Sequence, residues 1–150
     1  MFLPKIIQGG MGAGVSDWRL ANSVASVGQL GVISGTALDS VLVRRLQLGD
    51  VGGHMRRGLA AFPVPAVAER ILSRYFKSEA EQNEKPCKLI AGFRIDPNAN
   101  VVDLTIAANF VEVFLAKEGH QGHIGVNLLD KIQMPNLTSM FCAMLAGAVS

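Results

Sequence analysis

The chain has 150 residues, of which 49% are hydrophobic and 17% are charged, and its formal net charge is +2. This length suits one ordinary domain, and this composition supplies a buried core. The 14 basic and 12 acidic residues are scattered, so no basic stripe indicates nucleic-acid binding. No apolar run reaches the roughly eighteen residues of a membrane span, and no signal peptide is evident. We therefore expect a cytoplasmic protein without a nucleic-acid or membrane partner.

A glycine-dense loop follows the first predicted strand. Residues 4–8 form that strand, residues 9–14 the loop, and Ser16 is expected to cap a helix that Gly28 closes. Glycine lets main chain approach a ligand closely, because it has no Cβ and tolerates positive φ. The dinucleotide fingerprint G-x-G-x-x-G fails, since its third glycine falls on Val15 or Asp17 in the two possible registers. A tight strand-to-helix turn without a ligand is the alternative.

Short apolar runs alternate with helical patterns along the rest of the chain. The continuously apolar run 30–34 is typical of a parallel strand covered on both faces. Strands are also expected at 88–95 and 124–129, and a polar loop at 77–87. Helices are expected at 39–48, 54–61, 66–76, around 104–115, and from Pro135 to Gly147. The order predicts an α/β protein with three or four parallel strands.

Two groups of polar side chains are candidate sites. Glu118, His120 and His123 follow a helix end and lack the i, i+4 histidine pair of H-E-x-x-H, so we expect no metal there. A histidine at the carboxyl end of a helix instead interacts favourably with the helix dipole. His120 and His54 are equal candidates to approach a substrate. We expect Arg56 and Arg57 to lie on a solvated helix face rather than to form a phosphate clamp.

Three segments carry a resemblance to a known family. They are residues 4–12, which contain Gln-Gly-Gly-Met-Gly, the strand at 30–35, and residues 115–129. Together they resemble the nitronate monooxygenases, flavoenzymes formerly called 2-nitropropane dioxygenases. The Gly-His-Met-Arg-Arg element at 53–57 resembles a subgroup that includes the flavin enoyl reductases of polyketide and polyunsaturated fatty acid synthases.

This resemblance implies an FMN-binding (β/α)8 TIM barrel, in which ligands gather at the carboxyl ends of the strands. The chain would form its amino-terminal part, as a partial barrel domain over residues 1–150 with a mainly helical insertion at about 37–87. Such a barrel typically needs about 250 residues, so the fold is expected to be incomplete. The cofactor-binding residues implied by the resemblance are Gln8, Gly9, Gly10, Met11, Gly35 and Asn127.

Three functions remain open for this chain. The first is oxidation of alkyl nitronates with O2 by an FMN-dependent oxidoreductase, and the second is flavin-dependent reduction of enoyl thioesters. The third is a non-catalytic, truncated barrel fragment. In the family, the catalytic histidine and the phosphate-binding loops lie beyond the matched segments, so no catalytic residue is assigned. For Asn127, capping of a turn at a strand end is the structural alternative. Self-association or a completing chain is expected as a partner.

Overall fold

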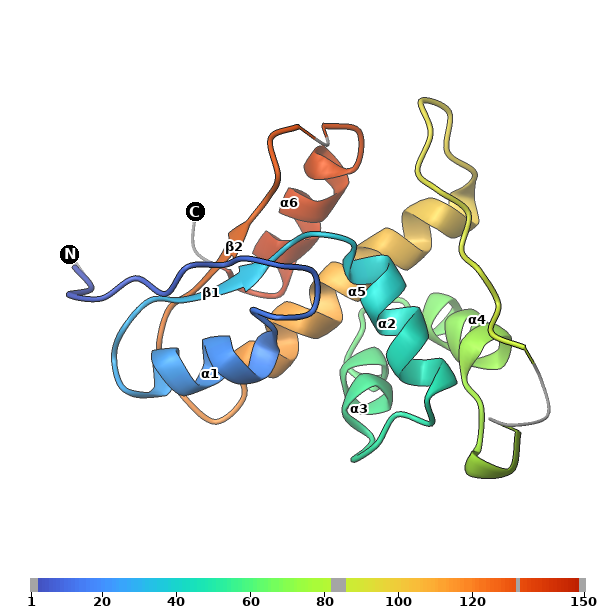
Figure 1. The fold of residues 1–150 in the computed structure, drawn as a ribbon, viewed down its shortest axis with the longest axis horizontal. Coiled ribbons are helices and arrows are strands. Elements are labelled where there is room, and N and C mark those ends of the chain that lie inside the picture. Colours follow the sequence, from blue (N-terminus) through green and yellow to red (C-terminus); the bar gives the residue numbers. More distant parts are fainter. Residues whose placement is uncertain (1–2, 82–85, 132, 149–150) are drawn as a thin grey trace.

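A computed structural model describes residues 3–81, 86–131 and 133–148 of the chain. Figure 1 shows a small sheet beside a group of helices. The elements described are α1 (Trp18–Ser26), β1 (Gly31–Ser34), α2 (Leu38–Gln47), α3 (His54–Ala60), α4 (Pro65–Tyr75), the short 3-10 turn η1 (Glu79–Glu81), α5 (Ala99–Lys117), β2 (Ile124–Asn127) and α6 (Asn136–Leu145).

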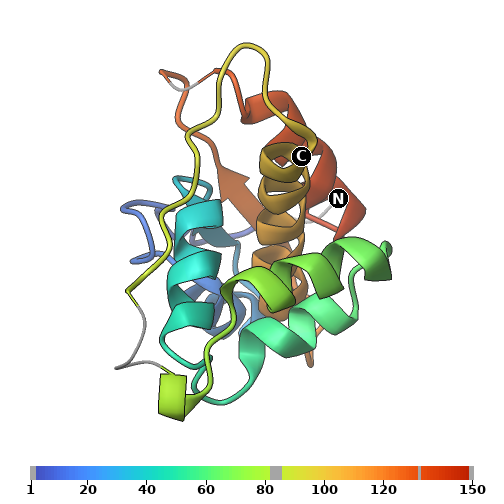
Figure 2. The same cartoon turned by 90° about the vertical axis from the view of Figure 1, so that its right-hand side faces the viewer.

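Helix α5 is the centre of the molecule. It contacts α1, α2, α3, α4, α6 and β2, and Figure 2 shows it enclosed by α2, the α3–α4 pair and α6. Its buried side chains lie on all sides, from Leu104 and Phe110 to Val113 and Leu115, as expected for a helix surrounded by others. By length and hydropathy alone α5 could cross a membrane, but 67% of its apolar window is buried inside this fold.

The sheet pairs β1 with β2 in parallel, in a register that joins Gly31 to Ile124 and Ser34 to Asn127. A third parallel segment touches β1 on its other side through a single bridge between Ile7 and Leu30. The side chains of Ile33 and Ile124 are fully buried. The carboxyl ends of all three segments therefore meet at one edge of the molecule, where the glycine loop begins.

The predicted barrel is wrong. The described residues form six α-helices and a two-stranded parallel sheet, not the three or four strands expected as part of an eight-stranded barrel. The run 88–95 forms no strand, and Leu89 and Ile95 are 88% and 94% exposed. The segment expected at 4–8 contributes only the bridge at Ile7. Helices α2 to α4, expected as an insertion, pack together with α5 and build much of the hydrophobic core.

Local sequence explains the starts of α1, α4 and α5. Asp17, rather than the expected Ser16, is the N-cap of α1, and its carboxylate accepts hydrogen bonds from the backbone N–H of Arg19 and Leu20. Pro65 occupies the first turn of α4, where its missing N–H costs nothing. Asn98 caps α5 by accepting a bond from Val101 N. The predicted helices are therefore confirmed, but Ser16 is not the N-cap of α1.

Candidate functional site

The glycine loop folds back onto the ends of the two strands. Asn127, the last residue of β2, donates a hydrogen bond from Nδ2 to the carbonyl oxygen of Gly10 over 2.7 Å. Gly10 is buried, and a Cβ there would lie 2.7 Å from Val32 Cγ1 and 2.9 Å from the carbonyl oxygen of Ile33. Glycine at this position therefore permits the contact between loop and sheet.

Ser16 fixes the far end of the same loop. Its buried hydroxyl accepts a hydrogen bond from Met11 N and donates one to the carbonyl oxygen of Gly9, both over 3.0 Å. Its own carbonyl accepts from Ser34 N over 2.9 Å. Sequence reasoning missed this role, because a serine ahead of a helix also fits the pattern of an N-cap.

The carboxamide of Gln8 is engaged within the chain. Its Oε1 accepts from Val32 N over 3.0 Å, and its Nε2 donates to the carbonyl oxygen of Gly9 over 2.7 Å. Gly35 lies across the edge, where its N–H donates to the carbonyl oxygen of Asn127 over 2.9 Å. Met11 is exposed at the outer surface of the loop. The structure thus gathers the six predicted residues at the carboxyl edge of the sheet.

Some polar groups at this edge keep free hydrogen-bonding capacity. The Gly10 carbonyl can only accept, so the Asn127 amide is oriented with Nδ2 toward the loop and Oδ1 away from it. Within the described part of the chain, neither Asn127 Oδ1 nor the N–H of exposed Gly9 has a hydrogen-bond partner. One acceptor and one donor therefore stay open on the exposed edge. Each polar atom of the Gln8 side chain already makes one hydrogen bond within the chain.

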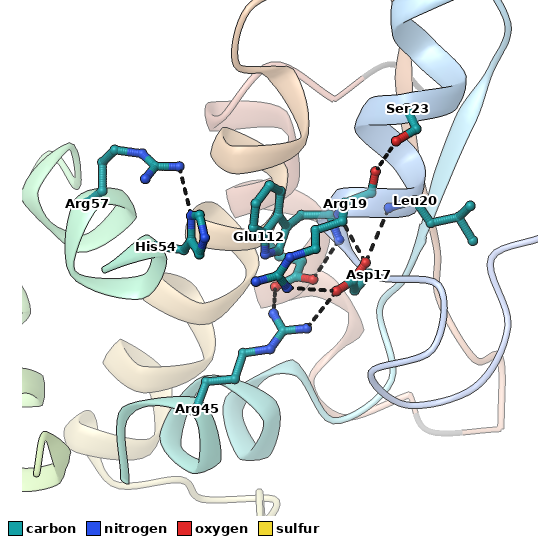
Figure 3. Close-up of polar contacts among 9 residues, drawn as sticks. Asp17, Arg19, Leu20, Ser23, Arg45, His54, Arg57 and Glu112 are labelled. Atoms are coloured by element: carbon teal, nitrogen blue, oxygen red, sulfur yellow. Dashed lines mark hydrogen bonds and ion pairs between the residues drawn. The ribbon is translucent and has the colours of Figure 1, made fainter. Parts of the chain in front are cut away.

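A buried ion-pair network, which sequence reasoning missed, lies on the opposite side of α1. Arg45 of α2 donates to Glu112 Oε2 of α5 over 2.9 Å and to Asp17 Oδ2 over 3.1 Å (Figure 3). Glu112 Oε1 accepts from Trp18 N over 2.9 Å. Burial raises the pKa of the Glu112 carboxyl, and the attraction of Arg45 opposes this only in part. The sequence could have indicated Glu112 as a buried acid, because it is the one acidic residue between Ile106 and Leu115.

The network continues toward α3, and within it Trp18 Nε1 is buried without a hydrogen-bond partner among the described residues. The His54 ring lies 4.9 Å from the Trp18 ring, centroid to centroid, and its Nδ1 is 3.2 Å from Arg57 Nη2. Arg57 also binds Glu118 Oε2 over 2.7 Å, and this hydrogen bond raises the pKa of the Arg57 guanidinium. Arg56 pairs with buried Asp50 over 3.1 Å. The two arginines thus have carboxylate partners, which a free phosphate clamp would lack.

His120 lies at the carboxyl end of α5 and bonds to it. His120 Nε2 lies 2.8 Å from the carbonyl oxygen of Ala116, and its Nδ1 lies 3.0 Å from Gly122 N. Because the Ala116 carbonyl only accepts and the Gly122 N–H only donates, the proton belongs on Nε2. Across the described ranges, no three His, Cys, Asp or Glu side chains converge closely enough to hold a metal ion.

The chain matches no protein-family model, and comparison with curated proteins and with solved structures gives no match. The likeness to nitronate monooxygenases therefore rests on the three sequence segments alone.

Proposed function

We propose that this chain binds FMN at the carboxyl edge of its parallel segments and serves an FMN-dependent oxidoreductase that oxidises alkyl nitronates with O2. The single observation that carries the proposal is the Asn127 to Gly10 hydrogen bond, which holds the glycine loop against the strand ends. Ligands of open α/β sheets characteristically bind outside the carboxyl ends of the strands. The sequence resemblance supplies the choice of FMN and of the reaction.

The residues have distinct parts in this proposal. The N–H of Gly9 and Oδ1 of Asn127 would meet the polar rim of the ring, and Met11 and Gly35 would lie beside it. Gln8, Gly10 and Ser16 would act as positioning residues, because their polar atoms hold the loop rather than face solvent. Bound FMN supplies the electron-accepting chemistry that nitronate oxidation needs. Groups that hold the phosphate would come from a completing chain or from a second copy.

The exposed side of α6 supports this partner. Leu137, Phe141 and Met144 are exposed there, and no residue of α6 is charged. Apolar side chains gathered on one helix face are typical of a surface that another protein covers. Self-association or a completing chain would bury them.

The test is an FMN titration of the purified chain, followed by visible absorbance and by quenching of flavin fluorescence. The Gly9→Val variant should weaken FMN binding at least about tenfold, equivalent to about 1.4 kcal/mol, because a branched side chain would cover the exposed main chain. A Cβ at Gly9 meets only Met11 Cγ, at 4.0 Å, so the fold should tolerate the change.

The matched control is Gly92→Val, an exposed glycine on the 86–97 coil whose Cβ would meet nothing within 4 Å. It should bind FMN as the wild type does. A wild-type chain that stays colourless and leaves flavin fluorescence unquenched, alone and at high protein concentration, would contradict the proposal. If the Gly9→Val variant bound FMN as tightly as the wild type, the loop would not be part of the FMN site.

A further inference from the structure

Helix α6 presents small side chains to the fold and large apolar side chains to the outside. Ser139, Cys142 and Ala143 are buried on the side that packs on α5. Figure 2 shows α6 at the outer edge of the fold, with α5 on its inner side. The side chains on the outer side are 51–80% exposed and are Leu137, Met140, Phe141, Met144 and Leu145. The apolar stripe of a surface helix normally faces the core, so this outer stripe lacks the cover that such stripes have.

The exposed side chains form two parallel ridges on α6. Leu137, Phe141 and Leu145 follow one another at four-residue intervals, and Met140 and Met144 form a second row beside them. Rows at this spacing are the ridges by which helices of globular proteins most commonly interlock, at a crossing angle of about −50°. A second α6 carries the same ridges and the same groove. Two copies can therefore interlock about a twofold axis beside Phe141, the middle of the longer ridge.

The absence of charge on this face suits contact between two identical copies. From residue 132 to residue 150 the sequence contains no charged side chain. In a twofold contact a residue near the axis meets its own copy, so a charge there would be repelled. Helices that lie in a membrane surface are instead rich in lysine and arginine on their polar face. The uncharged ridges of α6 thus favour a second copy over a charged protein partner or a membrane.

The exposed apolar area is that of a modest protein interface. At roughly 200 Å² for a large side chain that is fully exposed, the five exposed fractions amount to about 600 Å² per copy. Two copies would bury about 1,200 Å², which is the lower end of the range for specific interfaces. An interface of this size fits a dimer that forms reversibly with concentration.

We propose that two copies of this chain form a twofold dimer through their α6 helices. The ridge of Leu137, Phe141 and Leu145 in each copy lies in the groove of the other, and the two Phe141 side chains meet at the axis. Of the two kinds of partner named above, this assigns a second copy to the face of α6. The dimer does not depend on flavin and its test contains none, so a failure here leaves the FMN proposal to its own titration.

The test is sedimentation velocity of the intact chain over a series of micromolar concentrations. The wild type should shift from monomer to dimer as its concentration rises. Phe141→Glu sets two carboxylates against each other at the axis, and it should weaken the dimer at least about tenfold. The matched control is Ile95→Glu, the same change at a 94% exposed side chain outside α6. This control should dimerise as the wild type does.

A charge-swap pair identifies the occupant as a second copy. Phe141→Lys alone should also stay monomeric, because two ammonium groups then meet at the axis. An equimolar mixture of Phe141→Glu and Phe141→Lys should dimerise more strongly than either variant alone, since opposite charges now face each other. A mixture that gains nothing would contradict the twofold contact at Phe141. Circular dichroism shows whether each variant is folded.

Three results would overturn the dimer. They are a wild-type chain that stays monomeric at every concentration, assemblies that grow beyond a dimer, and an equal loss of dimer in Ile95→Glu. A monomeric wild type that binds neutral phosphatidylcholine vesicles would assign the α6 face to a membrane instead. If the Phe141 variants did not fold, the concentration series of the wild type would still decide whether the dimer exists.

Discussion

The two sides of α1 use polar groups in different ways. On the side of α2 and α5, Asp17, Arg45 and Glu112 are joined by short hydrogen bonds and sit largely out of water. On the side of the sheet, the loop is held by Ser16 and Asn127, yet Gly9 N and Asn127 Oδ1 stay open toward solvent. Charged groups that are paired inside a fold serve its stability, whereas open groups on an exposed, fixed frame can serve a ligand. The difference separates a structural network from a candidate site.

The largest expected effect comes from breaking the paired side. Glu112→Ala leaves Arg45 without its most buried partner, and breaking a buried pair typically costs 3–5 kcal/mol, so we expect a loss of about 3–5 kcal/mol in the free energy of unfolding. Urea denaturation measures it. Glu112→Gln keeps an acceptor for Trp18 N and should lose clearly less. If Glu112→Ala lowered the free energy of unfolding by less than about 0.5 kcal/mol, as at an ordinary surface position, the network would not contribute to stability as proposed.

Overfilling the contact between loop and sheet should come next. Gly10→Val forces a branched side chain against Val32 and the backbone of Ile33, and overpacking of this kind costs about 1–3 kcal/mol. The same substitution at Gly9, which has open space, should stay within about 0.5 kcal/mol. Thermal unfolding of both variants checks the pair. Equal losses at the two positions would show that the loop is not held against the strands as described.

Removing the hydroxyl that closes the loop should have a smaller effect. Ser16→Ala deletes the bonds to Met11 N and Gly9 O, at a net cost of about 1–2 kcal/mol. Hydrogen exchange at residues 9–16 should accelerate more than exchange in α5. The control is Ser26→Ala, whose exposed hydroxyl donates only to the Ser23 carbonyl. Unchanged exchange in Ser16→Ala would contradict the assigned role.

The smallest effect concerns pH. Because burial raises the pKa of Glu112 in the folded chain, the native state holds this proton to higher pH than the unfolded state does. The contribution to stability is full below the unfolded pKa of about 4.3 and is lost as pH rises through the folded pKa. The stability difference between the wild type and Glu112→Gln should therefore fall with rising pH, by less than about 1.4 kcal/mol per pH unit. Urea denaturation at several pH values tests this, and a difference that grows with pH would reverse the inferred shift.

Local patterns predicted the helices well. The expected ranges 39–48, 54–61 and 66–76 agree closely with α2, α3 and α4, because caps, prolines and the 3.6-residue period act within a few turns. The run 88–95 has the composition of a strand but no neighbouring strand to pair with, and it remains an exposed coil. Strand pairing depends on distant residues, which is why the number of strands and the barrel were predicted wrongly.

The same limit applies to the candidate site. The glycine loop and Asn127 stand out in the sequence, but the bond between Asn127 and Gly10 joins residues 117 positions apart. Ser16 fits the sequence pattern of a helix cap, but its hydroxyl binds Met11 N and the Gly9 carbonyl oxygen in the loop. Glu112 could have been noticed as a lone acid in an apolar run, yet its partner on α2 could not. FMN, the nitronate reaction and the completing chain remain predictions.

The sequence by itself determined the approximate positions of the helices, the glycine-rich character of the loop after the first parallel segment, and the apolar character of α5. These follow from backbone preferences and from periods that act over one or two turns. Only the tertiary structure decided that α5 is the centre, that the sheet stops at two strands, and which polar atoms are paired or open. Those outcomes depend on contacts between residues far apart in the chain, where packing and hydrogen-bond satisfaction outweigh local preference.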